Sequence, residues 1–524
     1  MSAIVHLSNG SFTGTYSGLA NVPGVFSQTI NDPGNTTSLV GNPTQYGFTL
    51  NSYNTSGSAS TTDGSVVNIL IIGQGTAVPP LSVNGFSAYQ FTHGLGYDTH
   101  ISYLNTSYGA PNAISYRKAI LLALHAKLVR DGSSLLDSAP NAYTAEMNDL
   151  ANSGMRWALV VDSGTPTSVI TARINALNTN ALGYLEGPNE LNTRDANWAI
   201  DDKNEMIQMV AAVNAASPSR GLQIIGPSIT NTYTTMGDLS SLENYGNYHY
   251  YSGAFIPESD GWGGGVYGYR YGDLRSGLNN ARQSSLTKPI AMTETGNEVQ
   301  PIPPNAGVVG GYVSEYSQAS YIERRTLWAA LHNVPLIFQY DLFSEGYTST
   351  DFNWGLIRAD GTQRPSLRAM QGLTNILDDT ADISQPCHVP VAATIPPPHF
   401  GITYYLTTDT VESMGFCKSN GEYDLVLWQP LQTTDINTGA DIAPPAPLSV
   451  AIQFDSGFTP TSSTLWSSNT SFNWSNTGSI TTSGSSVSIT DRPEILVFNG
   501  AVSPTPLPAL PTPAALLPSP SPTP

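Results

Sequence analysis

An alternation of short apolar strands with helices runs from about residue 95 to residue 377, and it limits the possible folds more than any other feature. Within it, Ile120, Leu121 and Leu124 recur at the spacing of one helix face. Eight strand–helix units of this kind predict an α/β fold, a closed (β/α)8 TIM barrel of parallel strands joined by crossover helices. Five of the predicted strands span 96–103, 128–130, 155–161, 222–226 and 335–340. The other three, strands four, six and seven, are predicted to end at Glu190, near Tyr251 and at Glu294. The predicted helices include 113–126, 143–152 and a closing helix at 366–377.

The segments on either side of this barrel, which we place at 86–379, contain strand patterns without helices. Residues 1–85 hold short alternating runs between Gly, Asn and Pro turns, which predict a β-rich amino-terminal segment. Residues 380–500 are expected to form an accessory all-β domain, a β-sandwich. Its strand-like runs include 401–406, 424–428 and 494–498. The Pro-, Ser-, Thr- and Ala-rich residues 501–524 predict a disordered, extended tail.

Two of the predicted barrel strands end in a glutamate. The run GYLEGPNELN carries the pair Asn189-Glu190 at the tip of strand four, and the run PIAMTETG carries Glu294 at the tip of strand seven. The separation of 104 residues, 294 minus 190, matches three intervening strand–helix units, so the two tips are expected to face each other. Cleavage of a glycosidic bond needs one carboxylic acid for the leaving oxygen and one carboxylate that attacks the sugar or activates water. The pair therefore predicts a glycosidase.

The ordered set of motifs over roughly residues 90–377 resembles glycoside hydrolase clan A, whose retaining enzymes are built on a (β/α)8 barrel. In that clan an acid/base Glu follows an Asn on strand four and a nucleophilic Glu ends strand seven, which Glu190 and Glu294 match. The run YHYY, with His249 and Tyr251, is similar to the strand-six motif of the clan. The strand-two Arg of the clan corresponds to Arg130 in VRDG, and the runs GYDTHISY and GLIRADGTQRP are also similar.

The resemblance implies that Glu190 is the general acid/base and Glu294 the nucleophile. Two other glutamates compete with them. Glu186 lies four residues before Glu190, deeper in the strand, where we expect it to bond to neighbouring barrel residues. Glu298 lies past Gly296, in a loop at the rim of the barrel.

Four polar residues are expected to support the two glutamates or the substrate. Asn189 is positioned to donate its amide to the sugar 2-hydroxyl, although a turn residue after a proline explains it as well. Arg130 is expected to hold Glu294 ionised through charge-assisted hydrogen bonds, and Tyr251 is expected to act on it through its hydroxyl. His249 is their hydrogen-bonding neighbour. The alternative for Arg130, Tyr251 and His249 is a structural role in the barrel interior, where neighbouring residues satisfy their hydrogen bonds.

Aromatic side chains near the predicted strand ends are candidates for stacking against a sugar. Trp354, Tyr340 and Phe343 are such candidates, with the protein core as the alternative, because the sequence has FQYDLF where many clan members carry a strand-eight Trp. His100 and Tyr103, after strand one, are further candidates for substrate binding. His125 falls within a helix on the outside of the barrel, so its expected role is structural.

The composition favours a neutral substrate and an extracellular setting. The net charge of −19 opposes binding to nucleic acid or to an anionic membrane surface. Charged residues make up only 11%, while Ser, Thr, Asn and Gly are abundant, which is typical of secreted proteins. The amino terminus lacks a secretory signal, so we expect either that a signal was removed or that export follows another route. No apolar run is long enough to predict a membrane span.

The two cysteines, Cys387 and Cys417, leave two possibilities open, a disulfide or a pair of buried thiols. A disulfide over this loop would stabilise the fold by roughly 3 to 4 kcal/mol. No Cys-x-x-Cys or His-Glu-x-x-His motif indicates a zinc site, so neither a metal nor another cofactor is expected.

The function predicted from these features is that of a retaining glycoside hydrolase. It would cleave β-glycosidic bonds of an extracellular poly- or oligosaccharide by double displacement, without a cofactor. Two alternatives remain open: a transglycosylase that uses the same glutamates, and a non-catalytic glycan-binding surface protein on a barrel scaffold.

Overall fold

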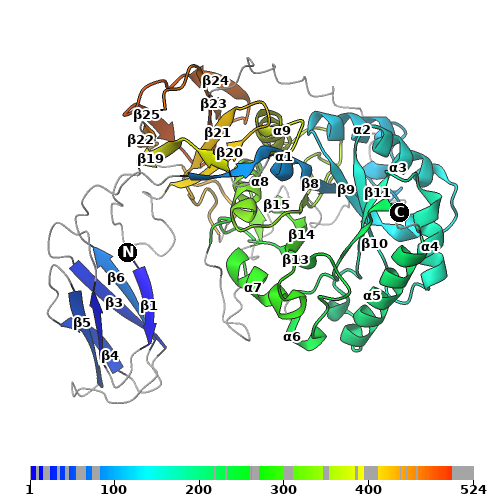
Figure 1. Ribbon diagram of the computed structural model, residues 1–524, viewed down its shortest axis with the longest axis horizontal. Coiled ribbons are helices and arrows are strands. Elements are labelled where there is room, and N and C mark those ends of the chain that lie inside the picture. Colours follow the sequence, from blue (N-terminus) through cyan, green and yellow to red (C-terminus); the bar gives the residue numbers. More distant parts are fainter. Residues whose placement is uncertain are drawn as a thin grey trace. The chain divides into compact units, whose positions relative to one another are not determined.

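A computed structural model describes most residues between Val83 and Phe498, together with six strands before them (Figure 1). The predicted strand at 401–406 and the predicted disordered tail at 501–524 lie outside the described residues. The other residues outside the description are 1, 7–10, 16–23, 32–35, 42–46, 55–65, 73–82, 217–219, 231–232, 260, 262–270, 300–310, 346–352, 384–386, 395–400, 407–410, 437, 444–445, 456–457 and 499–500. The chain forms two compact units, one over 1–81 with 394–397 and one over the remaining residues.

The amino-terminal unit consists of two three-stranded antiparallel sheets in its described part. One sheet has the order β1-β6-β3 and the other has the order β2-β5-β4. The strands are β1 (Ser2–His6), β2 (Ser11–Thr15), β3 (Gly24–Asn31), β4 (Thr36–Gly41), β5 (Gly47–Asn54) and β6 (Val66–Ile72). The short alternating runs between Gly and Asn turns in residues 1–85 thus form strands, as the sequence indicates.

The larger unit contains the predicted barrel of eight parallel strands (Figure 1). Its strands, in chain order, are β8 (Leu95–Asp98), β9 (Leu128–Gly132), β10 (Arg156–Val160), β11 (Leu182–Glu186), β12 (Gln223–Ile225), β13 (Gly246–Tyr250), β14 (Ile290–Thr295) and β17 (Ile337–Gln339). The sheet is closed by a parallel bridge between Ile225 and Tyr245, where Gly226 N donates a 2.8 Å hydrogen bond to Tyr245 O. The predicted α/β barrel is confirmed.

Helices join the barrel strands and surround them (Figure 1). They are α2 (Ala113–Ala123), α3 (Ala142–Asn152), α4 (Thr167–Ala176), α5 (Trp198–Ala215), α6 (Tyr233–Met236), α7 (Leu274–Ser285), α8 (Glu315–Leu331) and the closing α9 (Pro365–Leu377). A short helix, α1 (Ala88–His93), precedes the first barrel strand, and a short parallel pair, β15 (Glu298–Val299) with β16 (Tyr312–Val313), follows β14. None of the described helices combines the length and the apolar character that a membrane crossing requires.

Two predicted strand boundaries were wrong. Strand one ends at Asp98, and strand four ends at Glu186, so the Asn-Glu pair lies in the loop that follows. Pro188, which has no N–H to donate, stops the ladder there. Strand six ends one residue before Tyr251. The site residues at these strands are therefore displayed on the loops above the barrel.

The carboxyl-terminal part of the larger unit is all β in its described residues, which confirms the predicted accessory β region. A seven-stranded sheet has the order β18-β7-β20-β21-β26-β23-β24, and a three-stranded sheet has the order β19-β22-β25. Their strands are β7 (Val83–Ser87), β18 (Cys387–Val389), β19 (Val391–Thr394), β20 (Glu412–Cys417), β21 (Tyr423–Trp428), β22 (Leu448–Phe454), β23 (Ser463–Ser468), β24 (Trp474–Gly478), β25 (Ser486–Ile489) and β26 (Glu494–Phe498). Strand β7 precedes the barrel in the sequence, whereas its neighbours β18 and β20 follow the barrel. The sheet therefore combines segments from before and after the barrel in the chain.

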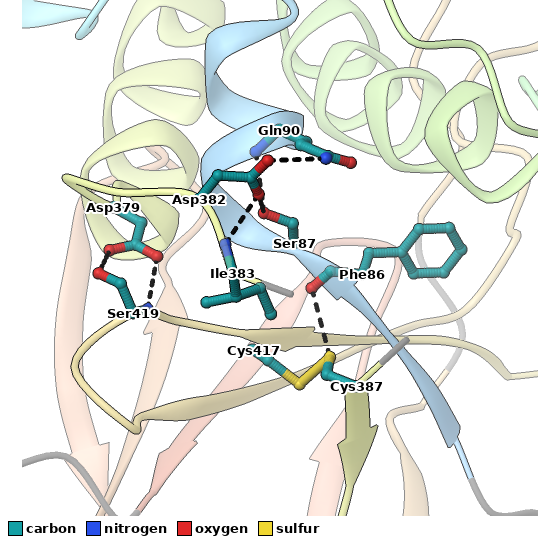
Figure 2. Close-up of a disulfide and its surroundings, with 9 residues drawn as sticks. All are labelled: Phe86, Ser87, Gln90, Asp379, Asp382, Ile383, Cys387, Cys417 and Ser419. Atoms are coloured by element: carbon teal, nitrogen blue, oxygen red, sulfur yellow. Dashed lines mark hydrogen bonds between the residues drawn. A yellow bond between two sulfur atoms is a disulfide. The ribbon is translucent and has the colours of Figure 1, made fainter. Parts of the chain in front are cut away.

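A disulfide between Cys387 and Cys417 joins β18 to β20 across β7 (Figure 2). Of the two possibilities that the sequence left open, the disulfide is therefore present. Gly85 of β7 faces the sulfur atoms, because a Cβ at this position would lie 2.2 Å from Cys387 Sγ. The absence of a side chain at Gly85 makes room for the bridge.

The β region packs on the barrel through the buried helix α8. The Arg324 guanidinium donates a 3.0 Å hydrogen bond to Glu258 and a 2.8 Å hydrogen bond to the carbonyl of Leu431. Trp428 Nε1 donates to the same Glu258 carboxylate at 2.7 Å. Arg324 is thus satisfied by Glu258 of the barrel and by Leu431 of the β region, whereas the adjacent Arg325 donates to Asn297 and Gln339 of the barrel.

Candidate active site

The carboxylate of Glu294 is held at the carboxyl end of β14 by two donors. Arg130 Nη1, from β9, donates a 2.9 Å hydrogen bond to Glu294 Oε1. The Tyr251 hydroxyl, from the residue after β13, donates a 2.9 Å hydrogen bond to Glu294 Oε2. The structure thus brings together three residues that the sequence predicted separately.

Glu190 reaches the same place from the loop after β11. Its backbone is left-handed, with φ 47° and ψ 39°, a conformation that non-glycine residues adopt uncommonly. The strain is compensated by Ser228, whose carbonyl and hydroxyl each accept a 3.1 Å hydrogen bond from Glu190 N. Strained residues of this kind concentrate at functional sites. The side chain of Glu190 remains 31% exposed, against 12% for Glu294, so it is the more open of the two to water.

His249 connects the two carboxylates. Its Nδ1 lies 3.0 Å from Glu190 Oε1 and 3.4 Å from Glu294 Oε2, while its Nε2 bonds to Thr293 Oγ1 at 3.1 Å. One oxygen from each carboxylate and the histidine nitrogen all lie within 4.8 Å of one another. The two predicted catalytic glutamates therefore form a close pair.

The charges around Glu294 favour its ionised form. Burial by itself raises the pKa of this carboxyl, but His249, Arg130 and the Tyr251 hydrogen bond outweigh it and hold the pKa below its ordinary value. Burial lowers the pKa of His249, and the carboxylates of Glu294 and Glu190 more than offset this, so the pKa is raised. The raised pKa favours the protonated form of His249, whose positive charge reduces the repulsion between the two carboxylates.

Glu186 is the last residue of β11, and its carboxylate accepts hydrogen bonds from barrel residues. Arg130 Nε donates to it at 2.7 Å and Nη2 at 2.9 Å, and the Asn247 amide and the Thr293 hydroxyl donate at 3.0 and 2.9 Å. This agrees with the expectation that Glu186 bonds to its neighbours. Sequence reasoning did not identify Asn247 and Thr293 as members of the network. Polar residues that alternate with apolar ones in buried strands, as Asn247 does with Tyr248, are the signal that marks them.

The side-chain oxygen of Asn189 has two hydrogen-bond donors, and its amide nitrogen has no acceptor among the described residues. Its Oδ1 accepts a 2.9 Å hydrogen bond from Arg130 Nη2 and a 3.3 Å bond from the Ser228 hydroxyl. Arg130 therefore holds Asn189, Glu186 and Glu294 at once. Glu298, the other rival glutamate, lies in β15 and accepts a 3.4 Å bond from Asn353 N.

Trp354 lies beside Tyr251, the residue that donates to the Glu294 carboxylate. Its ring packs edge-on against Tyr251 and Tyr340, at centroid distances of 5.2 and 5.9 Å. Gly296 permits this approach, since a Cβ there would lie 3.0 Å from the Trp354 ring and 2.4 Å from Tyr340 O. The Trp354 indole thus lies close to the end of the eighth barrel strand, β17, although Trp354 itself belongs to the loop that follows this strand.

His100 and Tyr103 lie after β8, and His100 bonds through Nδ1 to Glu345. Tyr103 stacks on the His100 ring at 4.6 Å. Phe343, in contrast, is fully buried against Tyr108 and Tyr116, so it belongs to the core.

His125 pairs with Asp378 at 2.8 Å, at the residue after the closing helix α9. This placement is away from the strand ends that carry the two glutamates. The expected structural role of His125 stays the simplest interpretation.

Two groups of side chains in the described part of the chain have the spacing of possible metal ligands. One is Glu190, His249 and Glu294, and the other is His100, Asp341 and Glu345. In each group the oxygen and nitrogen atoms lie within 4.8 Å of one another. The first group has Arg130 and Tyr251 as donors to its carboxylates, so acid–base and nucleophilic chemistry is available there without a metal.

No protein-family model matches the sequence, and no curated protein sequence matches it either. Among solved structures, the chain is similar to a family 39 glycoside hydrolase from the gut symbiont Bacteroides cellulosilyticus WH2, with TM-score 0.51 and 13% identity over 94% of this chain and 98% of that one. It is also similar to the GH51 arabinofuranosidase from Xanthomonas axonopodis pv. citri, with TM-score 0.50 and 12% identity over 79% and 97% of the two chains. At this identity the likeness shows the fold alone, a barrel of eight parallel strands.

Proposed function

We propose that the protein is a retaining glycoside hydrolase that cleaves β-linked poly- or oligosaccharides by double displacement. The observation that carries this proposal is the spacing of Glu190 and Glu294, whose nearest oxygens lie within 4.8 Å. Carboxyl groups about 5 to 5.5 Å apart are typical of retaining enzymes, whereas inverting enzymes place them about 6.5 to 9.5 Å apart to admit a water. The spacing favours retention.

In the first step, Glu294 attacks the anomeric carbon, and the bond to the leaving oxygen breaks as Glu190 gives that oxygen its proton. In the second step, Glu190 takes a proton from water, whose oxygen displaces Glu294 from the sugar. The lowered pKa of Glu294 keeps the nucleophile ionised, and the greater exposure of Glu190 gives it access to water. Both roles follow from the environments of the two carboxyls.

Asn189 is proposed to contact the sugar 2-hydroxyl. Its Oδ1 is occupied by Arg130 and Ser228, which directs the amide N–H groups toward a ligand. A donor to the 2-hydroxyl stabilises the transition state more than the ground state. Arg130 thus positions both Asn189 and Glu294.

The substrate is proposed to be an extracellular, neutral glycan. The net charge of −19 disfavours polyanionic ligands, and the disulfide between Cys387 and Cys417 fits an oxidising compartment (Figure 2). The complete set of donors around Glu294 favours catalysis over glycan binding alone, because binding does not need an ionised carboxylate held by three groups.

Digestion of a panel of β-glycans, with sizing of the products and proton NMR of the first product released, tests this proposal. Reducing sugars with retained anomeric configuration are expected. Products longer than the substrate would show that a sugar hydroxyl, and not water, intercepts the intermediate. An inverted product would exclude double displacement, and an inert but glycan-binding protein would favour the non-catalytic alternative.

A further inference from the structure

His100, Asp341 and Glu345 form a cluster of ionisable side chains to which the proposed double displacement assigns no step. Each residue offers one nitrogen or oxygen atom, and the three atoms lie within 4.8 Å of one another. Asp341 and Glu345 are only 2% and 4% exposed, whereas the side chain of His100 is 20% exposed. The two carboxylates of the cluster are therefore buried, and the imidazole reaches solvent.

The carboxylate of Asp341 lacks the partner that a buried charge requires. Its Oδ1 is buried and accepts no hydrogen bond from the described residues. The guanidinium of Arg364 is close enough for its charge to act on Asp341, yet it donates its hydrogen bonds to Ser344, Gly355 and Glu315. A buried carboxylate oxygen without a donor is unfavourable, so a cation bound beside it would satisfy it.

The other group with the spacing of metal ligands is different in this respect. There the carboxylate of Glu294 already accepts a 2.9 Å hydrogen bond from the Arg130 guanidinium. In the cluster of Asp341, the described residues supply only the imidazole of His100, which bonds to Glu345. Two buried carboxylates thus share one histidine. Their excess of negative charge favours a divalent cation.

The ends of two neighbouring barrel strands hold the three side chains in place. His100 follows β8 and Asp341 follows β17, and these strands pair in parallel. Leu342 N donates a 3.0 Å hydrogen bond to Asp98 O, which fixes the loop after β17 to the end of β8. Leu342 and the two residues after it are fully buried, so the segment between Asp341 and Glu345 is anchored in the core. The backbone of the cluster is therefore fixed before any ligand binds.

We propose that His100, Asp341 and Glu345 bind a divalent metal ion, and that Zn²⁺ matches them best. One imidazole with two carboxylates is a mixed set that suits Zn²⁺, whereas Ca²⁺ and Mg²⁺ favour oxygen ligands alone. Ligand atoms around a tetrahedral zinc lie about 3.4 Å apart, a spacing that rotations of these side chains can reach. No short sequence motif marks the site, because the histidine and the carboxylates come from opposite ends of the barrel.

Binding of the ion changes the contacts within the cluster. The hydrogen bond between His100 and Glu345 gives way to a bond from each residue to the ion, and the proton of this hydrogen bond passes to solvent. The two carboxylates balance the charge of the ion. Water takes the fourth position, on the side where His100 is exposed.

Calorimetric titration of the full chain with Zn²⁺, after treatment with a chelator, tests this proposal. One equivalent is expected to bind with micromolar or tighter affinity and to raise the melting temperature. Glu345→Gln and Asp341→Asn, which keep the shapes of the side chains, should each weaken binding at least about ten-fold. His125→Gln is the matched control and should bind as the natural protein does. His125 also pairs with a carboxylate, Asp378, but belongs to no group of three such ligands in the described part of the chain.

Three results would overturn the proposal: no binding of Zn²⁺, binding of Ca²⁺ in its place, or an unchanged affinity for Zn²⁺ in Glu345→Gln. Glu190→Gln should keep the affinity. Its loss there, with retention in Glu345→Gln, would place the ion between the proposed catalytic glutamates instead. Circular dichroism checks that each variant is folded, and His100→Gln repeats the test if Asp341→Asn does not fold. All of these measurements report binding or stability, so their outcome is independent of whether the protein is a hydrolase.

Discussion

Glu190 and Glu294 each bring a carboxylate oxygen within 4.8 Å of the other, although Glu190 lies in the loop after β11 and Glu294 lies near the carboxyl end of β14. His249 Nδ1 lies between them, 3.0 and 3.4 Å away. The same two side chains differ in their surroundings, since Glu294 accepts hydrogen bonds from Arg130 and Tyr251. This asymmetry supports the proposed roles of Glu294 as the nucleophile and Glu190 as the acid/base, and each role can be tested by substitution.

Replacing either glutamate by glutamine is expected to remove nearly all turnover and to leave the fold intact. Glu294→Gln deletes the nucleophile and Glu190→Gln deletes the proton donor, with little change in volume. The kcat/KM of each variant should fall by at least about 10³-fold. Glu298→Gln is the matched control, and it should stay within a few-fold of the natural protein. Loss of activity in Glu298→Gln with retention in Glu294→Gln would show that the nucleophile is misassigned.

Azide is expected to restore activity to Glu294→Gly. The anion enters the space left by the side chain and attacks the anomeric carbon from that face, so the glycosyl azide has the opposite configuration to the substrate. Proton NMR of the product checks this. A glycosyl azide that keeps the substrate's configuration would contradict the placement of Glu294.

Tyr251→Phe should shift the pH profile of the enzyme. The change removes the hydrogen bond to Glu294 Oε2, which helps to hold the pKa of Glu294 low, so that pKa should rise. A higher pKa means that the nucleophile is lost by protonation at higher pH. The acidic limb of kcat/KM against pH should therefore move upward, with a loss of about ten- to hundred-fold at the optimum. The control variant Tyr89→Phe should not move the acidic limb of the pH profile. An acidic limb that stays in place in Tyr251→Phe would show that the Tyr251 hydroxyl does not lower the pKa of Glu294.

The protein should be more stable in mildly acidic solution than above neutrality. Burial raises the pKa of Asp202 to about 8, and that of Glu205 and Glu243 to about 7. Since these folded-state pKa values exceed those of the unfolded chain, the stabilising contribution is complete below about pH 4 and is lost as the pH rises through 7 to 8. The melting temperature should accordingly be higher at pH 5 than at pH 8.

The variant Asp202→Asn tests whether Asp202 is the strongest contributor to this dependence of the melting temperature on pH. Asp202 is fully buried and its carboxylate oxygens have no hydrogen-bond partner among the described residues. The variant should flatten the decline of melting temperature between pH 5 and pH 8, because an amide does not ionise. Asp149→Asn, at a carboxylate that is 53% exposed, is the control. A melting temperature that rises between pH 5 and pH 8 would contradict the assignment.

Breaking the disulfide should cost stability and spare catalysis. Cys387 and Cys417 are 30 residues apart in sequence, so their double replacement by serine should lower the free energy of unfolding by about 3 kcal/mol. Denaturant unfolding measures this loss. Turnover should persist, since the bridge lies in the β region. Loss of turnover in a folded variant would show that this region contributes to the site.

Gly85→Ala probes the same bridge from β7. Its methyl group would lie 2.2 Å from Cys387 Sγ and 2.7 Å from Cys417 Sγ, so either the backbone or the bridge must shift. A lower melting temperature is expected, measured together with the free thiol content. Gly478→Ala, in β24 of the same sheet, places its methyl group in open space and serves as the control. Equal effects in the two variants would exclude steric conflict with the bridge.

The barrel and the two glutamates could be predicted from the sequence because their signals are local. Apolar periodicity distinguishes strands from helices, and a carboxylate at the end of a parallel strand falls on the face where barrels carry their chemistry. Arg130 and His249 lie within barrel strands and Tyr251 directly follows one, and the resemblance to clan A placed them near the pair.

Tertiary structure decided what depends on partners distant in the sequence. Glu186 and Glu190 are four residues apart, and only the path of the loop after β11 shows that Glu186 bonds to Arg130 while Glu190 meets His249. The pairing of β7 with β20 and the approach of Trp354 to Tyr251 likewise join segments from opposite ends of the larger unit or from different loops. Local periodicity carries no information on such contacts, because side-chain packing and loop geometry fix them only when the whole chain is folded.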